Sequence, residues 1–233
     1  MSVRTPVPRV HQLVRLGLFS CYLVETDDGL TLIDTNFFGS TPGIRAEVER
    51  LGKPLRRILI THAHADHVGS LDALAEAFPG IDIAASRRTA RLMAGDRSLD
   101  ADEAGLSLKG GYLTTRTRPN LLGDDGQIVA GFRAIDTPGH AIGHMSWMEI
   151  TSGYLFAGDA LASAGGGLHV TGVFRLGFPF PYFVTASRAQ ALASARKLAA
   201  ARPTAIFPVH GRAVLEPAED LARAIAEAER AFA

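Results

Sequence analysis

Short runs of alternating apolar and polar residues fill the first part of the chain, a pattern typical of β-strands. They predict strands at about residues 10–16, 19–25 and 29–34. Between the last two, the segment Asp27-Asp28-Gly29 has the composition of a tight hairpin turn, because such residues tolerate left-handed backbone angles. The amino-terminal part is therefore predicted to consist of strands joined by short turns.

The rest of the chain combines helical periodicity with further apolar runs. Helices are predicted at about residues 42–51, 71–78, 87–94, 185–201 and 217–231, and strands at about 57–60, 81–84, 127–135, 146–150, 154–157 and 205–208. Residues 96–126 are polar and contain glycine, so we expect a loop with short helical turns there. Strands in both halves, interleaved with helices, fit an α/β fold in which two sheets pack face to face with helices outside, a four-layer αββα sandwich.

No repeat, low-complexity tract or linker interrupts this pattern, and we expect one domain over residues 1–233. A hydrophobic content of 47% is ordinary for a soluble globular protein. Lys and Arg total 24, as do Asp and Glu, so the formal net charge is zero and no nucleic-acid partner is expected.

The sequence gives no sign of export or membrane insertion. The first ten residues lack the apolar stretch of a signal peptide, and no segment approaches the length of a membrane span. Cys21 is the only cysteine, which excludes an intramolecular disulfide, and its place in a predicted strand suggests a buried apolar role. We therefore expect a cytoplasmic protein with no membrane partner.

The chemistry of the chain centres on the segment after the strand predicted at 57–60. Four side chains that can bind a divalent cation fall within six positions there: His62, His64, Asp66 and His67. A His-x-His alternation places both rings on one side of an extended segment. Asp66 and His67 follow where the chain must turn into a helix, so they can point to a neighbouring spot. This arrangement suits two metals better than one.

Three other apolar runs also end in a candidate ligand. His140 follows the run at 131–135, Asp159 follows 154–157, and His210 follows 205–209. Each of these three candidate ligands has a glycine beside it, which permits a sharp turn and close backbone approach. Four strand ends that each deliver a metal-binding side chain are hard to assign to chance.

Several segments carry a resemblance to a known family. They are SCYLV at 20–24 with LIDT at 32–35, THAHADHVG at 61–69, TPGHAIGH at 137–144, FAGD at 156–159 and PVHG at 208–211. In order and spacing the chain resembles the metallo-β-lactamase fold superfamily over almost its whole length. The resemblance implies the αββα sandwich with metals at the sheet edges. It also implies two metal sites, the first bound by His62, His64 and His140, the second by Asp66, His67 and His210, with Asp159 bridging them.

The resemblance also bears on the reaction. True class B β-lactamases typically have a cysteine where this chain has Asp159. The aspartate instead resembles that of glyoxalase II-type thioesterases, lactonases and tRNA-processing or phosphodiester hydrolases of the same fold. The resemblance therefore implies a hydrolase that acts on a small ester, lactone or thioester. Because glyoxalase II-type enzymes carry an additional basic C-terminal region and only residues 211–233 follow His210, a lactonase-like activity is favoured.

Other reactions stay open. One is a sulfur dioxygenase with a single iron held by His62, His140 and Asp159. Another is β-lactam hydrolysis as the main or a side activity. A non-catalytic metal-binding module and a nuclease are disfavoured by the full ligand set and the neutral charge, respectively.

A dinuclear hydrolase would use two divalent cations, most simply zinc, with iron or manganese as alternatives. Asp66 would be the catalytic carboxylate that orients the attacking water.

The roles of four further residues are open. Asp34 is expected to orient a metal-binding histidine or to cap a strand, and His144 to support a ligand or to be structural. His169 is a weaker candidate at the substrate mouth, and Tyr182 is a weaker candidate for an oxyanion donor. The aromatic segment 174–183 predicts either an apolar wall beside the metals or a core or homodimer contact.

Overall fold

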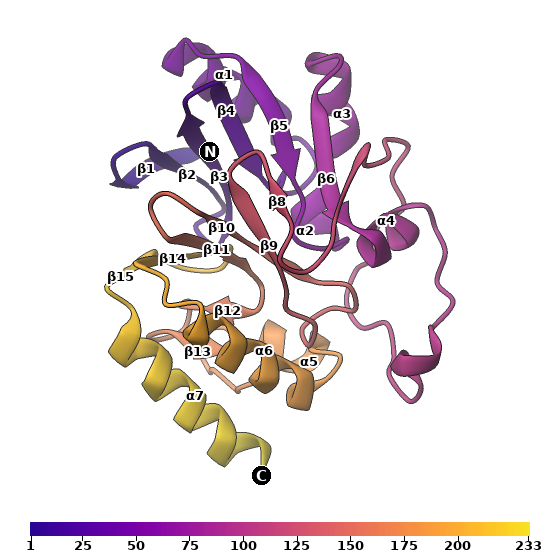
Figure 1. Ribbon diagram of the computed structural model, residues 1–233, viewed down its shortest axis with the longest axis vertical. Helices are drawn as coiled ribbons and strands as arrows, with labels where there is room; N and C mark the ends of the chain where they lie inside the picture. The colour runs from indigo at the N-terminus through magenta and orange to yellow at the C-terminus, as the bar shows by residue number, and fades with distance from the viewer.

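The computed structural model describes residues 1–233 and is built around two large β-sheets (Figure 1). The first sheet has seven strands in chain order: β1 (Ser2–Val7), β2 (Val10–Arg15), β3 (Phe19–Thr26), β4 (Gly29–Ile33), β5 (Leu55–Leu59), β6 (Asp82–Ser86) and β7 (Leu121–Gly123). The first four strands pair antiparallel, and those from β4 to β7 pair parallel. Parallel neighbours require crossover connections, which the helices of this half supply. These are α1 (Thr41–Leu51), α2 (Ala65–Val68), α3 (Leu71–Ala77) and α4 (Arg87–Met93).

The second sheet has six strands in the order β15-β14-β11-β10-β9-β8. Its strands are β8 (Ile128–Val129), β9 (Phe132–Asp136), β10 (Met145–Glu149), β11 (Tyr154–Gly158), β14 (Ala205–Pro208) and β15 (Val214–Leu215). A separate two-stranded ribbon consists of β12 (Leu161–Ala162) and β13 (His169–Val170). The remaining helices are η1 (Ala101–Glu103), α5 (Phe180–Val184), α6 (Arg188–Ala200) and α7 (Ala218–Phe232).

Three apolar layers hold the two sheets and their helices together. The layer between the sheets contains the largest buried side chains, among them Tyr22 from the first sheet and Trp147 and Phe156 from the second. A second layer joins the first sheet to α1, α3 and α4, and a third joins the second sheet to α6 and α7. Helices therefore cover both outer faces, as Figure 1 shows, and the predicted αββα sandwich is confirmed.

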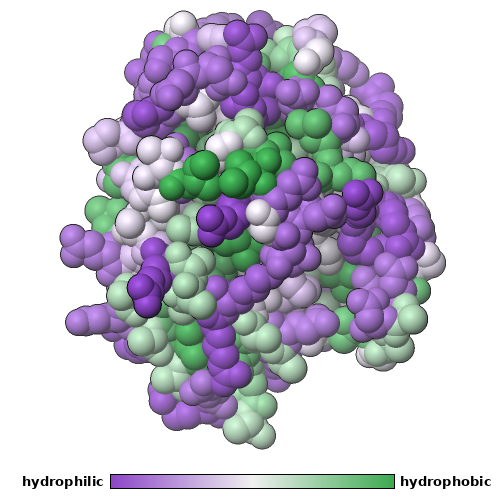
Figure 2. Space-filling model, viewed as in Figure 1, coloured by the Kyte–Doolittle hydropathy of each residue, from purple (hydrophilic) through white to green (hydrophobic).

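Sequence periodicity explains how the outer helices bind their sheets. In α7 the buried residues Leu221, Ala224 and Ala228 recur at intervals of three and four positions and form one apolar face. The opposite, hydrophilic faces of the helices contribute to the mainly polar surface in Figure 2, where apolar side chains gather near the middle of the view.

None of the helices combines the length and the apolar character that crossing a lipid bilayer requires.

The structure corrects some predicted boundaries. The strand predicted at 127–135 is two strands, β8 and β9, because Ala130 and Gly131 adopt left-handed backbone angles and form a two-residue hairpin turn. The helix predicted from residue 185 begins at Arg188, where the Ser187 hydroxyl accepts a hydrogen bond from the Gln190 N–H and caps the helix. Strand β1 and helix α5 were not predicted. Cys21 is fully buried, as expected.

Candidate metal centre

The candidate ligands meet because of strand direction. Strands β9 and β11 both pair antiparallel with β10, and β14 pairs parallel with β11, so all three run the same way. Their carboxyl ends lie at one edge of the second sheet and deliver His140, Asp159 and His210 there. Strand β5 of the first sheet ends beside them and continues into His62 and His64. The four strand-end segments singled out in the sequence thus converge on one place.

The converging side chains form two groups of potential metal ligands. Within each group, one nitrogen or oxygen atom from every residue lies within 4.8 Å of the others. The first group is His62, His64 and His140, and the second is Asp66, His67, Asp159 and His210. Six of these side chains are buried, and Asp66 is 17% exposed. The structure therefore brings together all seven residues that the sequence proposed.

Asp159 contacts both groups. Its Oδ2 lies 3.4 Å from Nε2 of His140 in the first group and 3.1 Å from Nε2 of His210 in the second. Its Oδ1 lies 3.5 Å from Nε2 of His67. A carboxylate in this position can reach two cations at once, which is the arrangement expected of a bridging ligand.

Unpaired polar atoms show that the cluster suits metal ions. His67 Nε2 and Asp159 Oδ1, which face each other at 3.5 Å within the cluster, are buried and have no hydrogen-bond partner. A buried polar atom left unpaired costs about 1–3 kcal/mol, so such atoms are rare without a purpose. Imidazole nitrogen and carboxylate oxygen are the donors that zinc, iron(II) and manganese accept. The donor set thus fits two divalent cations, whose identity it does not determine.

Burial and charge set the ionisation of the two groups differently. Burial, reinforced by neighbouring histidines, lowers the pKa of His64 to about 3 and also lowers the pKa of His62 and His140. Burial acts in the same direction on His210, but the charge of Asp159 and hydrogen bonds to carboxylates override it and raise the pKa to about 10. The three histidines of the first group are therefore neutral. The second group contains the two carboxylates, whose negative charge favours bound protons or cations.

Residues behind the ligands fix their rings. Asp34, fully buried at the end of β4, accepts hydrogen bonds from His67 Nδ1–H and from the Thr61 N–H and hydroxyl, each at 2.8 Å. His64 Nε2–H donates to the Lys109 carbonyl oxygen at 2.9 Å, which leaves Nδ1 unprotonated. Such contacts select the tautomer and orientation of a ligating imidazole. The orienting role considered for Asp34 is the one its contacts support.

His144 is a structural residue beside the centre. Its Nε2 accepts a hydrogen bond from the Asp159 backbone N–H at 3.0 Å, so its Nδ1 carries the proton and lies 2.8 Å from the Thr137 hydroxyl. Both ring nitrogens are used, and none is free for a cation. The ring holds the backbone of Asp159 in place.

The centre opens into a cavity of about 290 Å³. Its floor contains His64, Asp66, His140, Asp159 and His210. Its walls are mainly apolar and come from two distant parts of the chain: Phe19 and Phe37 from the first, and Phe178, Phe180, Pro181 and Val184 from the second. The expectation that segment 174–183 supplies an apolar wall agrees with this lining.

Two weaker candidates lie outside the cavity. His169 is buried on β13, where its Nδ1 contacts the Gly167 carbonyl oxygen, and it does not line the mouth. The ring of Tyr182 packs against Phe174 and the Arg188 guanidinium rather than facing the cavity. The sequence also gave no sign of the contact from the Lys109 carbonyl oxygen to His64, because the two residues are 45 positions apart in sequence.

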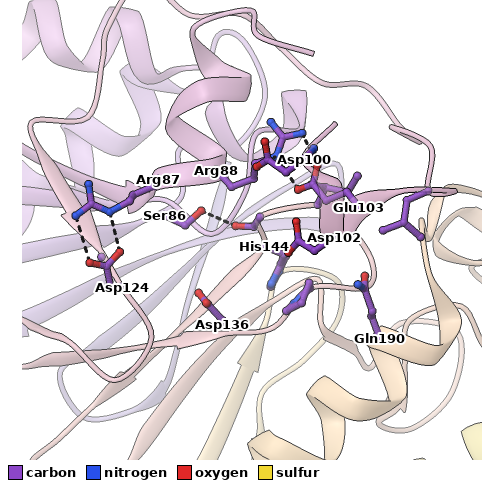
Figure 3. A pocket seen from close by; sticks show the side chains of 15 residues that line it. Ser86, Arg87, Arg88, Asp100, Asp102, Glu103, Asp124, Asp136, His144 and Gln190 are labelled. Carbon is purple, nitrogen blue, oxygen red and sulfur yellow. Dashed lines mark hydrogen bonds and ion pairs between the residues drawn. The ribbon is translucent and has the colours of Figure 1, made fainter. Parts of the chain in front are cut away.

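A second cavity, of about 280 Å³, lies beside His144 and is polar (Figure 3). Its charged side chains largely pair with one another: Arg88 with Glu103 at 2.7 Å, and Arg87 with Asp124 at 3.0 Å. It contains none of the seven candidate ligands. We therefore place the chemistry in the apolar cavity above the cluster.

The two-sheet sandwich with a His/Asp cluster at its edge defines a metallohydrolase class of protein. A sequence profile described as the metallo-beta-lactamase superfamily matches residues 16–210. The chain belongs to this superfamily.

Relatives and solved structures agree with this assignment. An uncharacterized protein of Bacillus subtilis, YobT, is 42% identical over 212 residues, which cover 91% of each chain. A hydroxyacylglutathione hydrolase of Gloeobacter violaceus is 33% identical over 71% of this chain and 58% of its own. The chain spans about half the length of the hydroxyacylglutathione hydrolases that it matches.

Two solved structures extend the comparison. TTHA1623 in a di-iron-bound form shares 28% identity with a TM-score of 0.65, covering 95% of this chain and 98% of its own. A metallo-beta-lactamase from Erythrobacter litoralis, 22% identical with a TM-score of 0.71, covers 98% of this chain and 96% of its own, and shows the fold alone.

Proposed function

We propose that this protein is a metal-dependent hydrolase that cleaves a small ester, lactone or thioester with an activated water. The observation that carries the proposal is the pair of ligand groups joined by Asp159 at the floor of an open cavity. His62, His64 and His140 would hold one cation, Asp66, His67 and His210 the other, and Asp159 would bridge them. Cations held there would lower the pKa of a bound water toward neutrality and would polarise a carbonyl oxygen.

The protein's own residues supply position and proton transfer. Asp66 is the one member of the cluster with appreciable exposure, and it faces the cavity where a substrate would lie. Both of its contacts to histidines, at 3.4 Å and 3.7 Å, use Oδ2, which leaves Oδ1 to orient the attacking water and to accept its proton. Burial opposes ionisation of Asp66, but His67 and His210 overcome it and lower its pKa to about 2, so the carboxylate is ionised at neutral pH.

Asp66→Asn tests this role. With both metals saturating, we expect kcat on a panel of esters, lactones and thioesters to fall at least about 100-fold, because the amide cannot accept the proton. Glu76→Gln is the control, since Glu76 is an exposed carboxylate on α3 that pairs only with Arg116. Unchanged turnover in a metal-replete Asp66→Asn protein would remove Asp66 from the mechanism.

Metal analysis on the same samples separates the reaction classes. About two divalent ions per chain with hydrolysis of one substrate class supports the dinuclear hydrolase. One iron per chain, oxygen consumption with a persulfide and no hydrolysis would instead support the sulfur dioxygenase. The presence of two complete ligand groups favours the hydrolase.

A further inference from the structure

The cavity above the metal centre has two apolar walls. Phe19, at the start of β3, and Phe37, in the loop after β4, form one of them. Phe178, Phe180 and Val184, on and just before α5, form the other. A substrate whose reacting carbonyl sits at the floor must therefore place a neighbouring group against these walls.

Packing against the metal centre holds these walls in place. The Phe19 ring contacts Phe37 at 4.6 Å and His210 at 5.4 Å between ring centroids, in edge-on geometry. The buried Phe178 ring lies 4.9 Å from His210 and 5.8 Å from Phe180. Because both walls rest on a candidate ligand, the apolar surface is fixed next to the reacting atoms.

Apart from the two cations that the proposed function places at its floor, the cavity lining offers no positive charge to an anionic substrate. No lysine or arginine lines it, and its ionisable residues all belong to the His/Asp cluster. Lys109 lies beside the lining residue Gly110 but is not itself a lining residue, and its ammonium group donates to the Thr185 carbonyl oxygen at 3.1 Å. Carboxylates held against the apolar walls, away from the cations, would lose their water without gaining a counter-charge, which is costly. A glutathione moiety carries two carboxylates, so this lining disfavours it.

We propose that the cavity selects substrates with an uncharged, apolar acyl group of about four to eight carbons, and discriminates against glutathione conjugates. This inference rests on the proposed hydrolytic function and specifies its substrate. A volume of about 290 Å³ holds roughly ten water-sized groups at about 30 Å³ each, enough for a scissile group and a short chain. Each methylene buried against the walls strengthens binding about fourfold.

A matched substrate series tests the inference. Acyl thioesters of N-acetylcysteamine with two-carbon and six-carbon chains share one scissile bond and one leaving group, and S-lactoylglutathione carries the charged alternative. We expect kcat/KM to rise at least about tenfold from the two-carbon to the six-carbon chain, and to be lower for the glutathione conjugate.

Two phenylalanines of α5 provide a matched pair of variants. Phe180 and Phe183 are 64% and 63% exposed, yet only Phe180 lines the cavity. Phe180→Ala is expected to lower kcat/KM for the six-carbon substrate about tenfold and to leave the two-carbon substrate within about twofold. Phe183→Ala is expected to change neither. Because both rings are exposed, the thermal unfolding midpoint of each variant should stay near that of the parent protein, which excludes misfolding as the cause.

The outcomes distinguish this inference from the proposed function. Hydrolysis with no dependence on chain length, or with a preference for the glutathione conjugate, overturns the inference and leaves the hydrolase standing. Equal effects of Phe180→Ala and Phe183→Ala on the six-carbon substrate also overturn it. No hydrolysis of any thioester, ester or lactone by the metal-replete protein overturns both proposals.

Discussion

Replacement of Asp34 by asparagine should weaken one metal site and spare the other. Asp34 contacts His67, a member of the second ligand group, and none of the three histidines of the first group. The backbone of Asp34 has a φ of 58°, in the left-handed region that asparagine also tolerates, so Asp34→Asn introduces no backbone strain. The substitution changes the hydrogen bonding and little else.

The size of the effect follows from the three hydrogen bonds that Asp34 accepts. One oxygen accepts from the Thr61 N–H, and the other accepts from the Thr61 hydroxyl and from His67 Nδ1–H. In either orientation, the asparagine NH₂ group faces an N–H donor, that of Thr61 or that of His67. If it faces His67, the ring proton must move to Nε2, the atom that points toward Asp66 and Asp159 and would bind the metal. Loss of such a contact weakens metal binding about 10- to 100-fold, or about 1.4–2.8 kcal/mol.

Calorimetric titration of the chelator-treated protein with zinc measures this effect. The parent protein should bind two ions, and Asp34→Asn should keep one site of unchanged affinity and lose 10- to 100-fold at the other. Glu47→Gln is the control, because Glu47 is also a buried carboxylate but contacts only Arg50 and His11, outside the cluster. Two sites of parental affinity in Asp34→Asn would refute the argument that Asp34 fixes His67 for metal binding.

Two further predictions concern the same centre. Gly110→Ala should lower metal affinity at the first site, because a Cβ would lie 2.6 Å from the His64 ring and Gly110 has a φ of +88°; unchanged zinc binding would contradict this. In the metal-free protein, stability should be greatest near pH 6.5, as measured by urea unfolding midpoints at pH 5, 6.5 and 9. The pKa of His210 is about 10 in the folded protein and about 6.5 in the unfolded chain, so the stability that it contributes is lost as the pH rises from about 6.5 to about 10. The pKa of His64 is lowered to about 3 in the folded protein, so the stability that it contributes is lost as the pH falls below about 6.5. A urea midpoint that rises steadily from pH 5 to pH 9 would show that these histidines do not control stability. Saturating zinc should flatten the dependence of the urea midpoint on pH above pH 6.5.

The sequence alone determined most of the elements and the donor residues of the site. Apolar periodicity depends on neighbours a few positions apart, so strands such as β2 to β4 and the helix at 218–232 could be predicted from local pattern. The seven candidate ligands could be found for the same reason, because each follows an apolar strand within a few positions. The two-residue turn at Ala130 and Gly131 was missed because an apolar run continues across it.

Only the tertiary structure decided which groups surround those ligands. The carbonyl group of Lys109 reaches His64 from 45 positions away, and Asp34 reaches His67 from 33 positions away. The cavity lining likewise brings together Phe19 and Phe178, which are far apart in sequence and both contact His210. Such contacts depend on how two sheets pack and on which loops cross their edge, and no local periodicity encodes that geometry. The sequence thus specified which donors are available, and the packing of the sheets determined where they point and what substrate can approach them.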